Sequence, residues 1–310
     1  MKKTIAYISF IIFLAFSVVI AYRLSRNKDV QSVDLQFDGD RAFEHIKYQV
    51  SLGPRIPESQ AHAKFVQWIE AELSKAGWNT TQQVFTSLDH PIINIIGRRD
   101  VENGSDVPWI ILGAHYDSRL IADRDPNSEL RSHGVPSAND GASGVAVLLE
   151  LARVFPKDLP INVWLVFFDG EDNGNIPGWD WILGSRGFVE RLEGKPDAAI
   201  IVDMIGDRDL NIYYEKNSDP ELSKEIWGIA DNLAYSGQFI PIENHRILDD
   251  HIPFLEAGIK AVDIIDFNYP YWHTTMDTLD QVSPVSLKTV GETLRQWLIQ
   301  GASGVEVSTP

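Results

Sequence analysis

The chain has 310 residues and a formal net charge of -17 at pH 7, with 27 Lys and Arg against 44 Asp and Glu. This acidic balance argues against nucleic acid or an anionic membrane surface as a partner, because both require a basic face. The absence of cysteine excludes disulfides, thiolate catalysis and cysteine-ligated zinc, so any metal must be bound by nitrogen and oxygen atoms.

Residues 4–22 carry no charge and are rich in Ile, Phe, Val and Ala. A run of this length can span a bilayer, whereas the apolar core of a signal peptide is usually about 7–15 residues. We therefore expect residues 1–28 to be an uncleaved N-terminal membrane anchor with the rest of the chain on the extracytoplasmic side. A cleaved signal, giving a secreted protein, is the alternative. Positive charges at both ends of the run leave the positive-inside rule little asymmetry to use.

Residues 29–40 are polar and are predicted to form a linker. From residue 41 to about residue 301 we find no second linker, repeat or low-complexity stretch, and a hydrophobic content of 44% allows a sizeable core. One domain over residues 41–310 is the simplest organisation.

Helical and strand patterns alternate along this domain. Strands are expected at residues 92–96, 109–114, 161–168, 199–204, 210–214 and 261–265, and helices at residues 61–76, 145–155, 221–234 and 286–299. The strand segments are nearly continuous apolar runs, which is typical of strands buried on both faces. The pattern predicts an α/β three-layer sandwich with a mostly parallel, mixed central sheet, preceded by an N-terminal transmembrane helix.

Side chains able to bind a metal follow several of the expected strands. In chain order they are His115, Asp140, Glu171, Asp172, Asp203 and His273. In open α/β sheets, ligands bind beyond the carboxyl ends of the strands. Imidazole and carboxylate groups are the ligands of catalytic zinc sites, so the ordered set predicts a zinc enzyme.

Single members of this set have ordinary explanations. His115 and Asp117 point to the same side of an extended segment. His115 could be a metal ligand that the Asp117 carboxylate orients, or a histidine with only a structural role. Asp140 could be only a helix N-cap. Strand centres avoid aspartate, which makes Asp203 harder to explain without a function.

The pair Glu171-Asp172 ends a strand, so its two side chains point in different directions. One can bind a metal while the other acts as a general acid/base, a role that a raised pKa favours. As an isolated pair they would usually form a solvated turn. His273 lies in an aromatic cluster over residues 269–278, which fits core packing or a pocket wall.

The motifs resemble the zinc aminopeptidase superfamily and, within it, the glutaminyl cyclases. They are Gly-Ala-His-Tyr-Asp-Ser, Asn-Asp-Gly-Ala-Ser-Gly, Phe-Phe-Asp-Gly-Glu-Asp, Asp-Met-Ile-Gly, Asp-Asp-His-Ile-Pro-Phe-Leu and Trp-His-Thr-x-x-Asp. They keep their order and rough spacing from about residue 43 to residue 297. Asp249, which starts the fifth motif, and Trp272 favour the cyclases, because similar aminopeptidases usually have Ser and Tyr there.

The resemblance implies one catalytic zinc held by Asp140, Asp172 and His273, with Glu171 as the general acid/base. At the position of Asp172 the superfamily usually has glutamate. The aspartate is one methylene shorter, so the strand end must approach the metal more closely or the denticity must change. Some bacterial cyclases are similar to this chain in having Glu-Asp.

The resemblance also implies that Asp203 and Asp249 form a hydrogen-bond network behind the general acid/base. Trp272 would wall the substrate pocket, and Trp181 or Trp179 would complete it. A small aromatic pocket suits a flat, compact glutaminyl residue.

The implied function is a zinc-dependent glutaminyl-peptide cyclotransferase, which converts N-terminal glutamine of peptides or proteins to pyroglutamate and releases ammonia. The alternative is a two-zinc aminopeptidase, in which His115 and Asp203 bind a second zinc bridged by Asp140. A remote alternative is an inactive, membrane-tethered binding domain.

Overall fold

A computed structural model describes residues 35–102, 107–156 and 159–300. The chain divides into two units, residues 1–35 and 36–310, and only the second is described below. The predicted membrane anchor, residues 4–22, lies outside the described residues. Within the described ranges, no helix combines the length and the apolar character needed to cross a bilayer.

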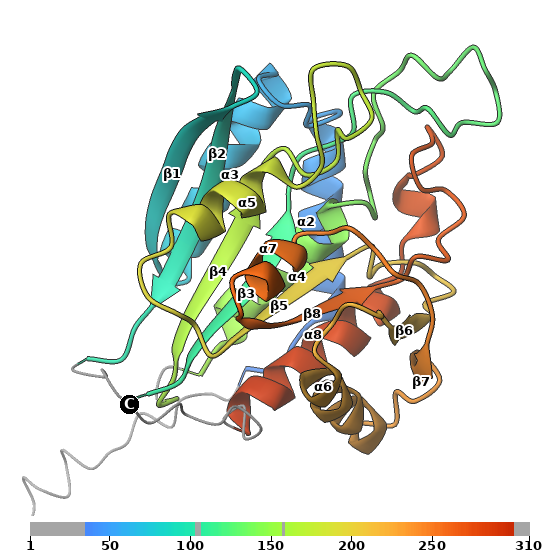
Figure 1. Cartoon of the computed structure of the whole chain (residues 1–310). Coiled ribbons are helices and arrows are strands. Elements are labelled where there is room, and N and C mark those ends of the chain that lie inside the picture. The colour runs from blue at the N-terminus through green and yellow to red at the C-terminus, as the bar shows by residue number, and fades with distance from the viewer. Residues whose placement is uncertain (1–34, 103–106, 157–158, 301–310) are drawn as a thin grey trace, which may run out of the picture. The chain divides into compact units, whose positions relative to one another are not determined.

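A six-stranded mixed sheet forms the centre of the domain (Figure 1). From one edge to the other its strands are β1 (Asn79–Ser87), β2 (His90–Arg99), β4 (Asn162–Phe168), β3 (Trp109–His115), β5 (Ala198–Asp203) and β8 (Lys260–Ile265). The last four run parallel to one another, whereas β2 is antiparallel to both β1 and β4. Because β3, β4, β5 and β8 are parallel, their carboxyl ends meet at one edge of the sheet.

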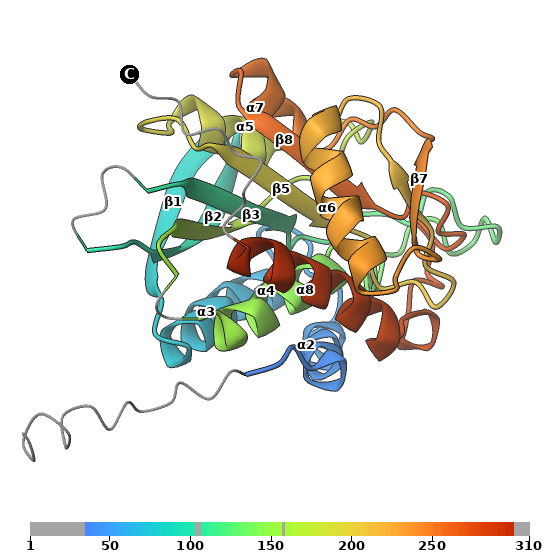
Figure 2. The same ribbon diagram turned by 90° about the horizontal axis from the view of Figure 1, so that it is seen from below.

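Helices cover both faces of this sheet, as Figure 2 shows. On one face lie α2 (Gly39–Ser51), α3 (Gln60–Lys75), α4 (Ala142–Val154) and α8 (Pro284–Ile299), and on the other lie α5 (Leu183–Glu190) and α7 (Ile252–Glu256). Helix α6 (Pro220–Asn232) packs beside α8 and the β8 edge. The predicted three-layer α/β sandwich with a mixed sheet is therefore confirmed for the described residues.

Helix α4 is the centre of one helical layer. All but one of its residues are buried, because it lies against β3 and is flanked by α2, α3 and α8. A helix that is apolar all round requires such an enclosed position. It follows that the start of α4, where Asp140 lies, is held firmly against the ends of the strands.

Several details differ from the sequence prediction; helices α5 and α7, for example, were not predicted. Helix α2 begins at Gly39, inside the predicted linker at residues 29–40, with the Asp38 side chain accepting backbone hydrogen bonds at its N-cap. Strand β1 was not predicted, because it is a polar edge strand. The predicted strand at 210–214 is only Ile212–Tyr214 (β6), which pairs with β7 (Phe239–Glu243) in a separate sheet.

Candidate active site

The ends of three parallel strands bring the predicted site residues together. His115 is the last residue of β3, Asp203 is the last residue of β5, and Glu171 and Asp172 lie shortly after the end of β4. All four side chains are buried. They follow apolar strand segments in the sequence, and the parallel arrangement of those strands explains why they converge.

Two groups of potential metal ligands share Asp140. In the first group, His115 Nε2 lies 3.1 Å from Asp140 Oδ1 and 3.2 Å from Asp203 Oδ1. In the second, His273 Nε2 lies 2.8 Å from Asp172 Oδ1 and 3.8 Å from Asp140 Oδ2. Within each group the ligand atoms lie within 4.8 Å of one another, so each could close around a single ion.

Asp140 does not cap α4. The N-cap of that helix is Gly141, which provides no side-chain hydrogen bond, so the capping explanation of Asp140 is wrong. Gly141 has φ +70°, and a Cβ there would lie 2.8 Å from the His115 ring; glycine lets the start of the helix approach His115. Asp277 accepts hydrogen bonds from the backbone N–H groups of Asn139 and Asp140, which fixes the Asp140 side chain between the two histidines.

The donor atoms fit zinc. Asp140 Oδ2 and Asp172 Oδ2 are buried and have no hydrogen-bond partner within the described part of the chain, as expected of oxygens reserved for an ion. The distal nitrogens of both histidines face carboxylates: His115 Nδ1 is 3.5 Å from Asp117 and His273 Nδ1 is 3.6 Å from Asp123. Such pairs orient metal-binding imidazoles. A nitrogen and oxygen set of this composition suits a catalytic zinc.

Crowding of buried acids shifts their pKa values. Burial raises the pKa of Asp172 to about 6 and that of Asp203 to about 7, with Asp140 adding to both shifts and the histidines opposing them. Burial also raises the pKa of Glu171 well above its usual range. The charge of His115 opposes this shift, whereas the charges of Asp172 and Asp249 add to it. Concentrated negative charge of this kind favours a cation at the ligand groups and a proton on Glu171.

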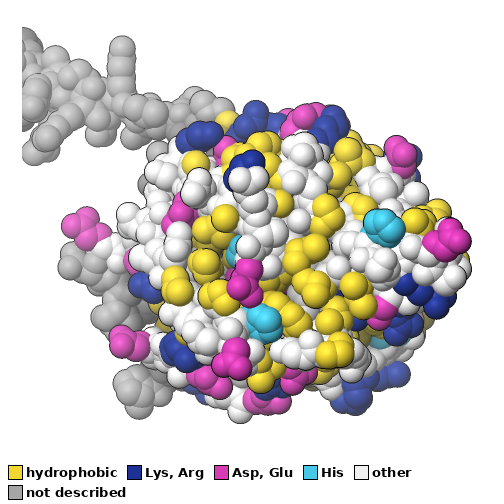
Figure 3. All heavy atoms as spheres, turned by 90° about the horizontal axis from the view of Figure 1, so that it is seen from above, with side chains coloured by type: hydrophobic (Ala, Val, Ile, Leu, Met, Phe, Trp, Pro, Cys, Tyr) yellow, Lys and Arg dark blue, Asp and Glu magenta, His cyan; other side chains and the backbone are white. Residues whose placement is uncertain are grey.

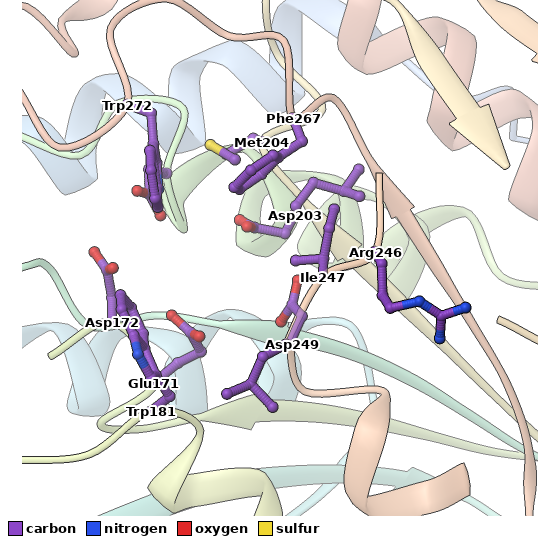
Figure 4. Close-up of a pocket in the computed structure, with 13 residues that line it drawn as sticks. Glu171, Asp172, Trp181, Asp203, Met204, Arg246, Ile247, Asp249, Phe267 and Trp272 are labelled. Carbon is purple, nitrogen blue, oxygen red and sulfur yellow. The ribbon is translucent and has the colours of Figure 1, made fainter. Parts of the chain in front are cut away.

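A cavity of about 190 Å³ opens onto these carboxylates. Figure 4 shows the acidic groups of Glu171, Asp172, Asp203 and Asp249 turned toward it. Its apolar walls come from the aromatic and aliphatic side chains of Trp181, Met204, Ile247, Leu248, Ile265, Phe267 and Trp272. On the face of the molecule seen from above, hydrophobic side chains gather on the surface (Figure 3). The cavity itself combines acidic side chains with aromatic and aliphatic walls.

The two tryptophans considered for the pocket have different positions. Trp181 lines the cavity, and its ring lies parallel to that of His273 at 6.0 Å. Trp179 is not among the lining residues; it stacks on His90 at 3.6 Å. Trp272 also lines the cavity and packs against Phe267.

A second layer of buried acids lies behind the cavity. Asp263, in the middle of β8, is fully buried, and burial together with Asp249 raises its pKa well above the usual range. His251 stands between Asp263, 3.8 Å from Nδ1, and Glu215, 3.2 Å from Nε2. Asp249, which lines the cavity, is thus linked through Asp263 to further buried titratable groups.

Several residues that shape the site were assigned no role from the sequence. Phe267 and Arg246 line the cavity, Asp277 holds the backbone at Asp140, and Arg119 contacts the segment after Glu171. Asp277 had a signal, since it is the last residue of the Trp-His-Thr-x-x-Asp motif, and Arg119 directly follows the Gly-Ala-His-Tyr-Asp-Ser motif. Phe267 follows β8 by two residues and Arg246 precedes the Asp249 motif by three, but neither is a carboxylate or an imidazole, so no metal-binding pattern marked them.

A family model described as peptidase family M28 matches residues 94–298. The chain is 24% identical to a glutaminyl-peptide cyclotransferase of Boiga dendrophila, over 79% of this chain and 77% of that protein. It resembles the crystal structure of Porphyromonas gingivalis glutaminyl cyclase with a TM-score of 0.80 and 32% identity, covering 85% of this chain and 98% of that one. It is also similar to a Zn-dependent exopeptidase from Parabacteroides distasonis, with a TM-score of 0.79 and 28% identity, covering 86% and 99%.

Proposed function

The chain belongs to peptidase family M28, in its glutaminyl cyclase branch, and we propose that it is a zinc-dependent glutaminyl-peptide cyclotransferase. Its substrates would be peptides or proteins that begin with glutamine, and its products pyroglutamyl chains and ammonia. One observation carries the proposal: Glu171 lies in a small aromatic cavity, directly beside a three-ligand group of Asp140, Asp172 and His273.

The reaction forms a bond between the α-nitrogen and the side-chain carbonyl carbon of the same glutamine, and it breaks the bond from that carbon to the amide nitrogen. A zinc ion on the three ligands would supply a Lewis acid for the amide carbonyl. Because nucleophile and electrophile belong to one residue, the pocket contributes mainly orientation. Trp181 and Trp272 give it apolar walls against which a compact glutaminyl side chain can rest.

Glu171 is the residue suited to move the proton. It would accept a proton from the attacking amine and deliver it to the departing nitrogen, which leaves as ammonia. Its raised pKa favours the protonated form, which is the form that delivers the proton to the departing nitrogen. Asp203 and Asp249, which line the same cavity, would keep the proton on Glu171 between the two halves of this transfer.

A two-zinc aminopeptidase is the second candidate, and the group formed by His115, Asp140 and Asp203 favours it. In that enzyme water would be the nucleophile, and the first peptide bond would be broken. Both candidates use the same fold and most of the same ligands, so the products must distinguish them.

Mass spectrometry of a glutamine-initiated peptide, combined with metal analysis, tests the proposal. We expect the peptide to lose ammonia and the purified protein to hold about one zinc per chain. A matched peptide that begins with alanine should remain intact. Loss of the first residue from either peptide, with two tightly held zincs that activity requires, would contradict the cyclase assignment and support the peptidase.

We also propose that residues 4–22 anchor the enzyme in a membrane with its catalytic domain on the extracytoplasmic side. The support is the length and apolar composition of that segment. Exported chains expose a new N-terminal glutamine when a leader is removed, so a cyclase on that side would meet its substrates.

A further inference from the structure

Arg119 is an arginine that the proposed chemistry does not use. Only 1% of its surface is exposed. Its Nη1 donates a hydrogen bond of 2.6 Å to the backbone carbonyl of Asp172, and its Nη2 donates one of 3.2 Å to the carbonyl of Gly174. On the other side, its Nε is 2.7 Å from Asp123 Oδ1. A buried guanidinium is costly unless it is fully paired, and this one is aimed at the ligand-bearing segment.

Asp117 holds the same segment by its backbone N–H groups, whereas Arg119 holds it by its carbonyl groups. Its carboxylate accepts hydrogen bonds from the backbone N–H of Glu171 at 3.1 Å and of Asp172 at 3.3 Å. Asp117 and Arg119 are separated by one residue in the segment that follows β3. The peptide groups on both sides of the Asp172 Cα are therefore fixed, one by a carboxylate and the other by a guanidinium.

Arg119 also contacts the wall of the cavity. Its guanidinium carbon lies 5.1 Å from the centre of the Trp181 ring. A Cβ at Gly174 would lie 2.0 Å from the same ring, so the tryptophan packs directly on the backbone that Arg119 holds. One side chain thus links the Asp172 segment to the aromatic wall.

The short side chain of Asp172 explains why the position of its backbone matters. Aspartate places its carboxylate one methylene closer to the backbone than glutamate does, yet Asp172 Oδ1 still reaches within 2.8 Å of His273 Nε2. The Arg119 Nη1 is 3.8 Å from Asp172 Oδ1 but only 2.6 Å from the carbonyl oxygen. Arg119 therefore binds chiefly the backbone carbonyl of Asp172, which leaves the carboxylate available for an ion.

We propose that Arg119 is a positioning residue that holds the backbone of residues 172–174 close enough for the short Asp172 carboxylate to reach the metal. The inference rests on the proposed zinc at Asp140, Asp172 and His273. It predicts that Arg119 and the length of the side chain at position 172 are coupled. A merely structural arginine would not produce that coupling.

A double-mutant cycle on the full chain tests it, with zinc affinity measured by competition with a chelator. Arg119→Gln should weaken zinc binding by about 10–100-fold, the usual effect of losing a residue that supports a ligand. Asp172→Glu alone should also weaken binding, because the longer side chain overshoots. In the Arg119→Gln background the same Asp172→Glu should strengthen binding, since the longer side chain compensates for a relaxed backbone.

Two controls separate positioning from folding. Arg191→Gln removes a half-exposed arginine of the α5 end and should leave zinc affinity unchanged. Thermal unfolding in excess chelator reports the stability of each metal-free variant, and if Arg119→Gln does not fold, Arg119→Lys takes its place in the cycle. Unchanged zinc affinity in the Arg119 variant, or additive effects of the two substitutions, would overturn the inference. A wild-type chain that binds no zinc would instead refute the proposed function.

Discussion

Glu171 provides the sharpest test at the scale of single residues, because it adjoins a ligand without being one of the proposed three. Glu171→Gln removes the proton carrier and keeps the size of the side chain. We expect zinc content to stay normal while turnover of a glutamine-initiated peptide falls by about 10²–10⁴-fold, the range of general acid/base contributions. Metal analysis and steady-state kinetics on the same preparation check both parts.

His273→Ala is the companion variant, because it removes a proposed ligand. It should lose both the zinc and the activity. If Glu171→Gln turned over substrate at a near-normal rate, Glu171 would have no part in the mechanism. If His273→Ala kept its zinc, the assignment of the three ligands would be wrong.

The sequence allowed the metal-site candidates to be found, because ligands at the ends of parallel strands fall into a simple pattern. His115 and Asp203 each end an apolar run, and the structure brings them within 3.2 Å of one another. Arg119 could not be assigned in this way. Its role depends on where the carbonyl groups of residues 172 and 174 lie in space, and no periodicity of the sequence encodes that position.

Helix α2 allows a prediction at the scale of an element. Burial lowers the pKa of His45 to about 4 from its ordinary value of 6.5, against the opposing charge of Glu72; the ring packs edge-on against Trp68. In the unfolded chain His45 takes up a proton near pH 6.5, whereas in the fold it does so only near pH 4. Its neutral burial therefore costs stability progressively as pH falls through that window.

His45→Gln should remove this acid sensitivity. Between pH 7.5 and pH 5, the free energy of unfolding of the wild type should fall by up to about 2 kcal/mol more than that of the variant. Urea unfolding at both pH values, with a chelator present so that zinc does not contribute, measures the difference. Equal losses in the two proteins would mean that His45 is protonated in the fold.

The same helix shows where prediction of elements failed. Its first residue follows a polar stretch, and only the Asp38 cap and the buried Phe37 side chain mark the entry of the chain into the core. Strand β1 was not predicted for a related reason, since its side chains are only exposed or half-buried at the sheet edge. Buried strands such as β3 and β5 are apolar up to their last residues, His115 and Asp203, and were predicted correctly.

At the scale of the whole molecule, the acidic composition and the site are connected. Of the 44 acidic residues, five line the cavity or share its ligand groups: Asp140, Glu171, Asp172, Asp203 and Asp249. An acidic cavity attracts the positively charged N-terminus of a peptide. Membrane attachment, by contrast, would have to come from residues 4–22 through apolar burial, because a chain with net charge -17 gains nothing from an anionic lipid surface.

That proposed attachment can be tested by comparing the full chain with one that begins at Leu35, both expressed in bacterial cells. The shorter chain keeps Phe37, which is buried, and the Asp38 cap of α2, so we expect it to fold and to cyclise a glutamine-initiated peptide at the wild-type rate in lysates. The full chain should remain with membranes during alkaline extraction. Protease added to spheroplasts should digest its catalytic domain while cytoplasmic markers stay whole, because a cyclase that acts on exported chains must lie on the extracytoplasmic side. A domain that is protected until lysis would place the enzyme on the other side of the membrane.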